Sequence, residues 1–164
     1  MRSLVLIADE PANVARMRLA TRYAAGVRVI ATLDGREPVA AEIAALAPDI
    51  VVVDEMCQRI NTLTRLQEVR DSGAGATVLL LVPAHSRALA GDAVAAGAHA
   101  VLSWDAPAPA LGTVIGEIAL GRVLLSAQQR AEERPADVSA RPAATVQHLR
   151  LLGPQDARRA GASA

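Results

Sequence analysis

The chain has 164 residues, a formal net charge of zero and a hydrophobic content of 52%, enough for one domain with a buried core but hardly for two. The balanced charge does not favour direct nucleic-acid binding, and the single cysteine excludes an internal disulfide and indicates a reducing compartment. No apolar run reaches the roughly 18 residues of a membrane span, and the N-terminus lacks the pattern of a secretory signal. The sequence therefore predicts a soluble, cytoplasmic protein without a membrane partner.

Short apolar runs alternate with helical patterns along most of the chain. Strands are predicted at residues 3–8, 27–33, 49–54, 76–82 and 99–104. Helices are predicted at residues 11–26, 37–48, 60–73, 86–97 and 109–121. This βα alternation predicts an α/β fold in which a doubly wound, five-stranded parallel sheet carries helices on both faces. The run "DIVVVD" is the most apolar and should be the central strand, whereas "VRVIATL" has the polarity of an edge strand.

The composition changes after residue 126. Residues 127–164 are rich in Ala, Arg and Pro and contain one short apolar cluster, "VQHLRLL". Such a segment offers too little apolar surface to offset the entropy of ordering it. We therefore expect one folded domain over residues 1–126 and a largely disordered tail over residues 127–164.

Acidic residues end two of the predicted strands. Asp9 and Glu10 follow the first strand, and Asp54 ends the third. In doubly wound sheets the functional crevice lies at the carboxyl ends of the strands, where the strand order reverses. If the order is 2-1-3-4-5, these carboxylates converge, and they would repel, raise one another's pKa or recruit Mg²⁺. The alternative is that Asp9 and Asp54 only cap the helices that follow, although Asp54 lies several residues before the next helix.

Four segments, "LVLIADEP", "PDIVVVD", "AVAAGAHAVLSWD" and "LGTVIGEIALGRVLLS", resemble the CheY-like receiver domain of response regulators in two-component systems. The resemblance is greatest to the NarL-like subfamily and covers roughly residues 3–126. It implies a flavodoxin-like (βα)5 fold with strand order 2-1-3-4-5. NarL-like receivers precede a helix-turn-helix effector, and "TVQHLRLLG" faintly resembles the start of that effector. The tail is too short for the whole effector domain, so it would be at most a vestigial effector start.

The resemblance also implies roles for the acidic residues. Asp54 is at the position of the phosphoacceptor, and Asp9 is at the second position of the acidic pair. Glu10 follows Asp9 and should point elsewhere, since neighbouring residues of an extended segment alternate in direction. Asp9 and Asp54 would hold Mg²⁺ weakly at most.

Other pocket positions depart from the pattern of the family. Ala8 replaces the first acid, Val82 or Pro83 replaces the switch hydroxyl, and Trp104 replaces the lysine that neutralises the phosphoryl group. The chain has no lysine at all, so nothing replaces that charge like for like. We expect Val82, Pro83 and Trp104 to form an apolar rim, with Trp104 packed over the vacated pocket. In this position Trp104 could also lock the switch in one state or bind a ligand.

These departures predict an atypical receiver that acts in signal transduction or transcriptional regulation through protein–protein contacts. It would be no enzyme, would require no cofactor and would not depend on Mg²⁺-dependent phosphorylation. Its partner would be a second copy, through the face of the fourth helix, fifth strand and fifth helix, or else a DNA-binding regulator or a kinase. A small molecule in the crevice is a further option. The alternative is a phosphorylatable response regulator that uses Asp54 and controls a DNA-binding partner.

Overall fold

The computed structural model describes residues 1–122, so the predicted tail over residues 127–164 lies outside the described residues. The strands are β1 (Arg2–Ala8), β2 (Val27–Asp34), β3 (Ile50–Asp54), β4 (Thr77–Val82) and β5 (Ala100–Ser103). The helices are α1 (Pro11–Thr21), α2 (Ala40–Leu46), α3 (Arg59–Asp71), the 3-10 helix η1 (Ala84–Leu89), α4 (Ala90–Ala96) and α5 (Ala108–Ala119). Across residues 1–122, each helix is too short or too polar to cross a membrane.

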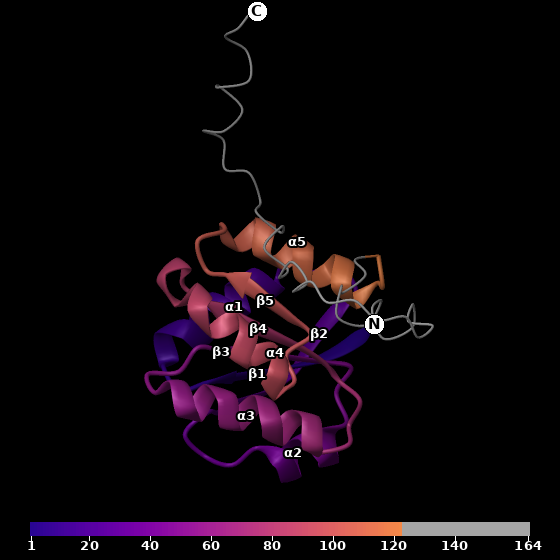
Figure 1. Cartoon of the computed structure of the whole chain (residues 1–164). Helices are drawn as coiled ribbons and strands as arrows, with labels where there is room; N and C mark the ends of the chain where they lie inside the picture. The colour runs from indigo at the N-terminus through magenta and orange to yellow at the C-terminus, as the bar shows by residue number, and fades with distance from the viewer. Residues whose placement is uncertain (123–164) are drawn as a thin grey trace, which may run out of the picture.

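The five strands form one parallel sheet in the order β2-β1-β3-β4-β5. This confirms the predicted order, with β2 at one edge and β3 in the centre. All five residues of β3 are buried, which explains why its sequence is almost entirely β-branched. Figure 1 shows the sheet between two helical layers, with α1 and α5 on one face and α2, α3 and α4 on the other.

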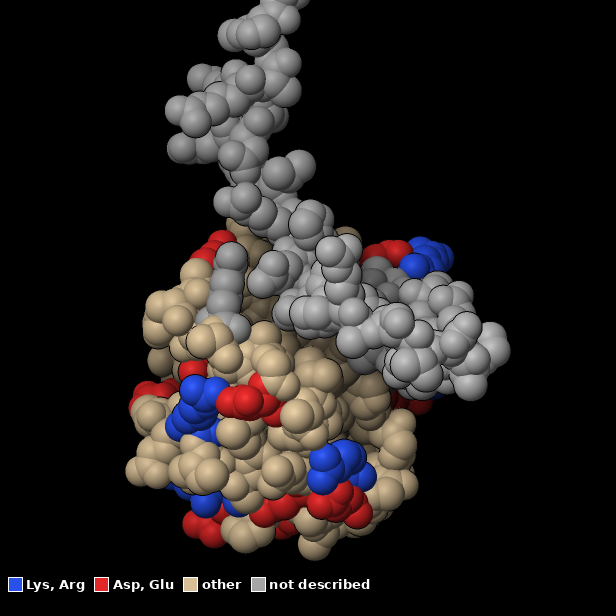
Figure 2. All heavy atoms as spheres, in the orientation of Figure 1, with Lys and Arg blue, Asp and Glu red and all other residues tan. Residues whose placement is uncertain are grey.

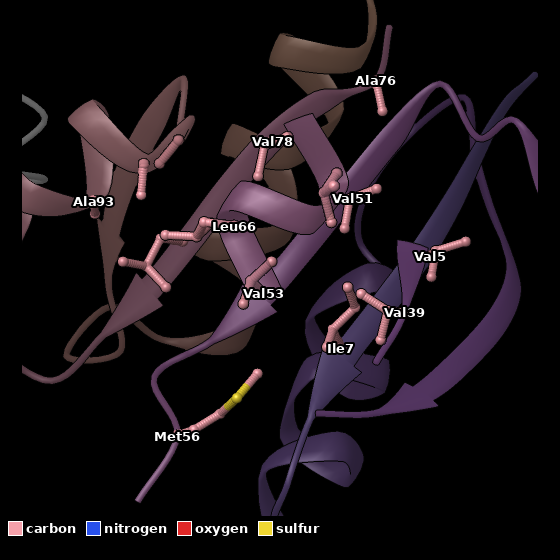
Figure 3. Packing of buried hydrophobic residues seen from close by; sticks show 14 of the residues in the cluster. Val5, Ile7, Val39, Val51, Val53, Met56, Leu66, Ala76, Val78 and Ala93 are labelled. Carbon is pink, nitrogen blue, oxygen red and sulfur yellow. The ribbon is translucent and has the colours of Figure 1, made fainter. Parts of the chain in front are cut away.

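Side chains of alternate strand residues divide the core between these two layers. Val5, Val51 and Val78 belong to the cluster on the side of α2, α3 and α4, which also contains Leu66 of α3 (Figure 3). Their immediate neighbours along each strand point to the opposite face, where they meet α1 and α5. This period of two is what a parallel strand covered on both faces requires. Aliphatic residues fill both layers, so the chain builds its core without phenylalanine.

Three predicted helices differ from the observed ones. The helix predicted over residues 37–48 is shorter, since α2 begins at Ala40 and ends at Leu46. The helix predicted over residues 11–26 ends at Thr21, because the chain must return to the sheet before Gly26. The carbonyl of Gly26 accepts a 2.7 Å hydrogen bond from the Arg2 N–H, and Gly26 has a φ of 75°. The helix predicted over residues 86–97 consists of η1 followed by α4. The Ser86 N–H donates to the Pro83 carbonyl at 3.0 Å, an i to i+3 bond that begins this segment as a 3-10 turn.

Candidate functional site

The predicted acidic residues do lie at one end of the sheet. Asp54 is the last residue of β3 and is fully buried, and Asp9 follows β1 with 9% of its surface exposed. Because β1 and β3 are paired neighbours, the two carboxylates come close enough for the charge of Asp9 to act on Asp54. Glu10 is exposed but lines the same pocket as Asp54, so the expectation that it points elsewhere is wrong.

Two neutral N–H donors hold the carboxylate of Asp54. The side-chain amide of Asn13, on α1, donates to Oδ2 at 2.6 Å. The indole Nε1 of Trp104, just after β5, donates to Oδ1 at 2.7 Å. Each oxygen of the buried carboxylate therefore has a donor, which is how proteins reduce the cost of burying a polar group.

Burial nevertheless raises the pKa of Asp54 to about 6, because a carboxylate is less stable away from water. The hydrogen bonds from Trp104 and Asn13 lower the pKa, but they only partly offset the effect of burial. The nearby charge of Asp9 raises it further, and Arg16 lowers it slightly. Asp54 thus changes its charge only a little below neutral pH.

Asp9 holds the loop that follows β3. Its Oδ2 accepts a hydrogen bond from the backbone N–H of Cys57 at 3.0 Å, and its backbone carbonyl accepts one from the guanidinium of Arg36. Its Oδ1 is buried without a hydrogen-bond partner. The role of a helix cap is excluded for both aspartates, because Glu10 is the cap residue of α1 and Gln58 that of α3.

The expected apolar rim is wrong in part. Val82 ends β4 and is buried in the core, so it does not form part of a rim. Ala8, at the position of the first acid, is buried at the end of β1. Pro83 does line the pocket beside Asp54. Trp104 also lines it and is partly buried, but it contributes a polar hydrogen bond and does not act only as an apolar cover.

Two arginines near the site are already engaged. The guanidinium of Arg16 lies 4.3 Å from the centre of the Trp104 ring, in a cation–π contact. Arg59, the nearest arginine after β3 in the sequence, pairs with Asp92 on α4. Arg59 is therefore turned toward α4 and does not replace the missing lysine.

A pocket of about 530 Å³ opens above Asp54. The loops that follow β1, β3, β4 and β5 contribute to it, together with the first turns of α1. Its lining residues are Glu10, Asn13, Arg16, Asp54, Glu55, Met56, Cys57, Pro83, His85, Ser86, Trp104 and Asp105. The pocket therefore lies where the doubly wound topology predicts a ligand site.

The residues present do not fit the Mg²⁺ ion that the receiver resemblance implies. Mg²⁺ requires near-octahedral oxygen ligands. In the part of the chain that the structure describes, no three His, Cys, Asp or Glu side chains are grouped so as to hold a metal ion. Both oxygens of Asp54 and one oxygen of Asp9 already accept N–H bonds.

Sequence reasoning missed Asn13 and Arg16. Both lie on α1 and are three residues apart, so they share one face of the helix. The sequence did contain a signal for these two residues. In a doubly wound fold the helix after the first strand begins at the same edge of the sheet as Asp9. A polar pair in its first turns is a candidate for contact with the pocket.

Solved structures share this architecture. No protein-family model matches the sequence, and no curated protein matches it. The signal receiver domain of the response regulator NarL from Mycobacterium tuberculosis is similar with a TM-score of 0.62 and 22% identity, over 74% of this chain and 98% of that chain. The chain has the receiver-domain fold.

Other proteins with a similar fold come from other cellular systems. A pilus assembly-related protein from Burkholderia pseudomallei matches with a TM-score of 0.58 and 23% identity, over 78% of this chain and 91% of that chain. The response regulator ChrA of a heme-sensing two-component system matches with a TM-score of 0.52 and 27% identity, over 84% of this chain and 69% of that chain. The predicted receiver fold is confirmed, whereas the role of Asp54 as the acceptor-equivalent residue stays a prediction.

Proposed function

We propose that this chain is a receiver-fold signalling domain that acts through contacts with a protein partner, without Mg²⁺-dependent phosphorylation of Asp54. The observation that carries the proposal is that internal N–H donors, Asn13 and Trp104, already hold both oxygens of Asp54. The domain would then keep one arrangement of its pocket, and it would need no covalent modification to present its binding surface.

The chemistry of phosphoryl transfer supports this proposal. An oxygen of Asp54 would have to leave its donor in order to attack phosphorus, and the incoming group brings negative charge into a pocket that holds Glu10, Glu55 and Asp105. Enzymes that transfer phosphoryl groups, like receivers, stabilise the negative charge of the phosphoryl group with cations. Here the indole and amide donors are neutral. Losing one preorganised charge-stabilising group typically costs about 10² to 10³ in rate, and several are missing at this site.

A protein partner fits the described surface better than DNA does. On the face drawn in Figure 2, basic and acidic side chains are interspersed on a mostly uncharged surface. Exposed apolar residues include Val94 on α4 and Leu120 directly after α5. We expect the face of α4, β5 and α5 to bind a second copy of the chain or a DNA-binding regulator.

Beryllofluoride or acetyl phosphate with Mg²⁺ should leave the protein unchanged. Trp104 is the only tryptophan and contacts Asp54 directly, so its fluorescence reports any event at that carboxylate. We expect the same emission spectrum and elution volume with and without these reagents. The Asp54→Ala variant is the matched control for non-specific effects. A saturable change in the wild type that is absent from the variant would refute the proposal.

The second candidate is a phosphorylatable response regulator that controls a DNA-binding partner. One observation favours it: Asp54 lines the open pocket and so remains within reach of a small phosphodonor. Incubation with acetyl phosphate, followed by a gel that retards phosphorylated protein, separates the two candidates. A retarded band in the wild type that is absent from Asp54→Ala would favour this second function.

A further inference from the structure

We propose that the pocket above Asp54 is a binding site for a small organic cation that carries a guanidinium or amine group. The ring face of Trp104 would be its stacking surface. This inference rests on the proposed function, because a pocket that served phosphoryl transfer would have to attract the opposite charge. It deepens that function by naming the class of molecule that would regulate the site.

The charge of the lining favours a cation. Four carboxyl-bearing residues line the pocket, and they come from the ends of three strands: Glu10 after β1, Asp54 and Glu55 at the end of β3, and Asp105 after β5. Arg16 is the one arginine among the lining residues. Because a concave site with walls of low dielectric concentrates the field of its charges, this lining attracts cations and repels phosphate.

Arg16 shows what the pocket accepts. Its guanidinium lies 4.3 Å from the centre of the Trp104 ring, so the aromatic face already holds a planar cation. The hydrogen bond from the indole to Asp54 fixes the ring in this orientation. Arg16 is largely exposed and belongs to the surface of α1, so an incoming cation could displace it without opening the core.

The pocket has room and unused acceptors for a ligand. Its volume of about 530 Å³ lies within the range of about 300 to 1,000 Å³ that is typical of small-molecule sites. Two of its lining carboxylates, on Glu10 and Asp105, are exposed, so their oxygens can accept hydrogen bonds from a ligand. A ligand with several N–H donors would complement these acceptors, which an anion cannot do.

The test compares two probes of the same shape and different charge. Methylguanidinium and methylurea are added to the full chain at concentrations far below those that unfold proteins, and binding is followed by Trp104 fluorescence and by calorimetry. We expect saturable binding of methylguanidinium and none of methylurea or inorganic phosphate. Equal responses to methylguanidinium and methylurea, or no response to either, would overturn the inference.

Two variants identify the site. The Arg16→Ala variant lacks the guanidinium that competes for the face of Trp104. It should bind methylguanidinium about three- to tenfold more tightly, a factor that corresponds to the free energy of one cation–π contact. Glu55→Gln should weaken it by a similar factor, because one attracting charge is lost. Both side chains lie at least partly in solvent, so both variants should fold, which circular dichroism checks. Unchanged affinity in both variants would contradict the assigned site.

The outcomes separate this inference from the function on which it rests. If beryllofluoride with Mg²⁺ has no effect and methylguanidinium does not bind, the cation site is wrong while the proposed function stands. If beryllofluoride produces a change that depends on Asp54, the proposed function is wrong, and the cation site loses its basis with it.

Discussion

Replacing Gly112 by alanine should destabilise the domain by about 3 kcal/mol, at the upper end of the usual cost of overpacking a core. Gly112 lies on α5 where that helix crosses α1. A methyl group at this position would come within 2.8 Å of Cβ of Tyr23 and still closer to the carbonyl oxygen of Ala20. Because the carbonyl belongs to the backbone, the clash can be relieved only by moving a helix.

The effect should reach the functional site through α1. This helix carries Asn13 and Arg16, which contact Asp54 and Trp104 respectively. Displacing α1 from α5 would lengthen the Asn13 hydrogen bond and move Arg16 from the indole. Urea unfolding followed by circular dichroism measures the loss of stability, and Trp104 emission in the folded variant measures the change at the site.

Gly91→Ala is the matched control. Gly91 lies in α4 and is exposed, and outside its chain neighbours and its own helix backbone a methyl group there would have no heavy atom within 4 Å. Alanine is the better helix former by about 0.5 to 1 kcal/mol, so this variant should be slightly more stable than the wild type. Equal effects of the two substitutions would contradict the close crossing of α1 and α5.

The fold was predictable because its signals are local and repeat along the chain. The "VVVD" run of β3 could only be a strand buried on both faces, and the alternation of five such runs with helices left one class of topology. Helix ends were less predictable. Nothing in the alanine-rich segment before Gly26 shows where α1 ends. That point depends on a distant contact, the hydrogen bond between the Gly26 carbonyl and the Arg2 N–H.

The site was predictable in position but not in chemistry. The ends of β1 and β3 placed Asp9 and Asp54 together, as the structure shows. The role of Trp104 was not evident, because comparing it with a missing lysine drew attention to its lack of charge and away from its N–H group. Whether an indole points its nitrogen at a carboxylate depends on a rotamer that tertiary packing selects, and sequence spacing does not determine it.

The second large effect is a loss of stability as the pH rises from about 4 to about 6. In the unfolded chain Asp54 should titrate near its ordinary pKa of 3.8, whereas in the folded protein its pKa is about 6. Between these values the folded state keeps a proton that the unfolded state has lost, so stability decreases with rising pH. The contribution is fully present below about pH 4 and is lost by just above pH 6. At about 1.4 kcal/mol per pH unit it amounts to about 3 kcal/mol.

Urea unfolding of the wild type and of Asp54→Asn at several pH values measures this contribution. Asparagine cannot titrate and leaves one N–H donor without an acceptor, which shifts stability by an amount that does not depend on pH. The difference between the two proteins should therefore change by about 3 kcal/mol between pH 4 and pH 7. A difference that stays constant across this range would show that Asp54 is not a buried acid with a raised pKa.

Trp104 emission gives the same titration in the folded state, because its N–H group donates to the titrating carboxylate. We expect a midpoint near pH 6 in the wild type and no transition in Asp54→Asn. Asn13→Ala should move the midpoint upward, since the Asn13 hydrogen bond favours the charged form of Asp54 and so lowers its pKa. Without this bond, the increase in pKa that burial causes is offset less. A midpoint that moves downward in this variant would mean that Asn13 stabilises the protonated acid. It would contradict the conclusion that the Asn13 hydrogen bond favours the carboxylate.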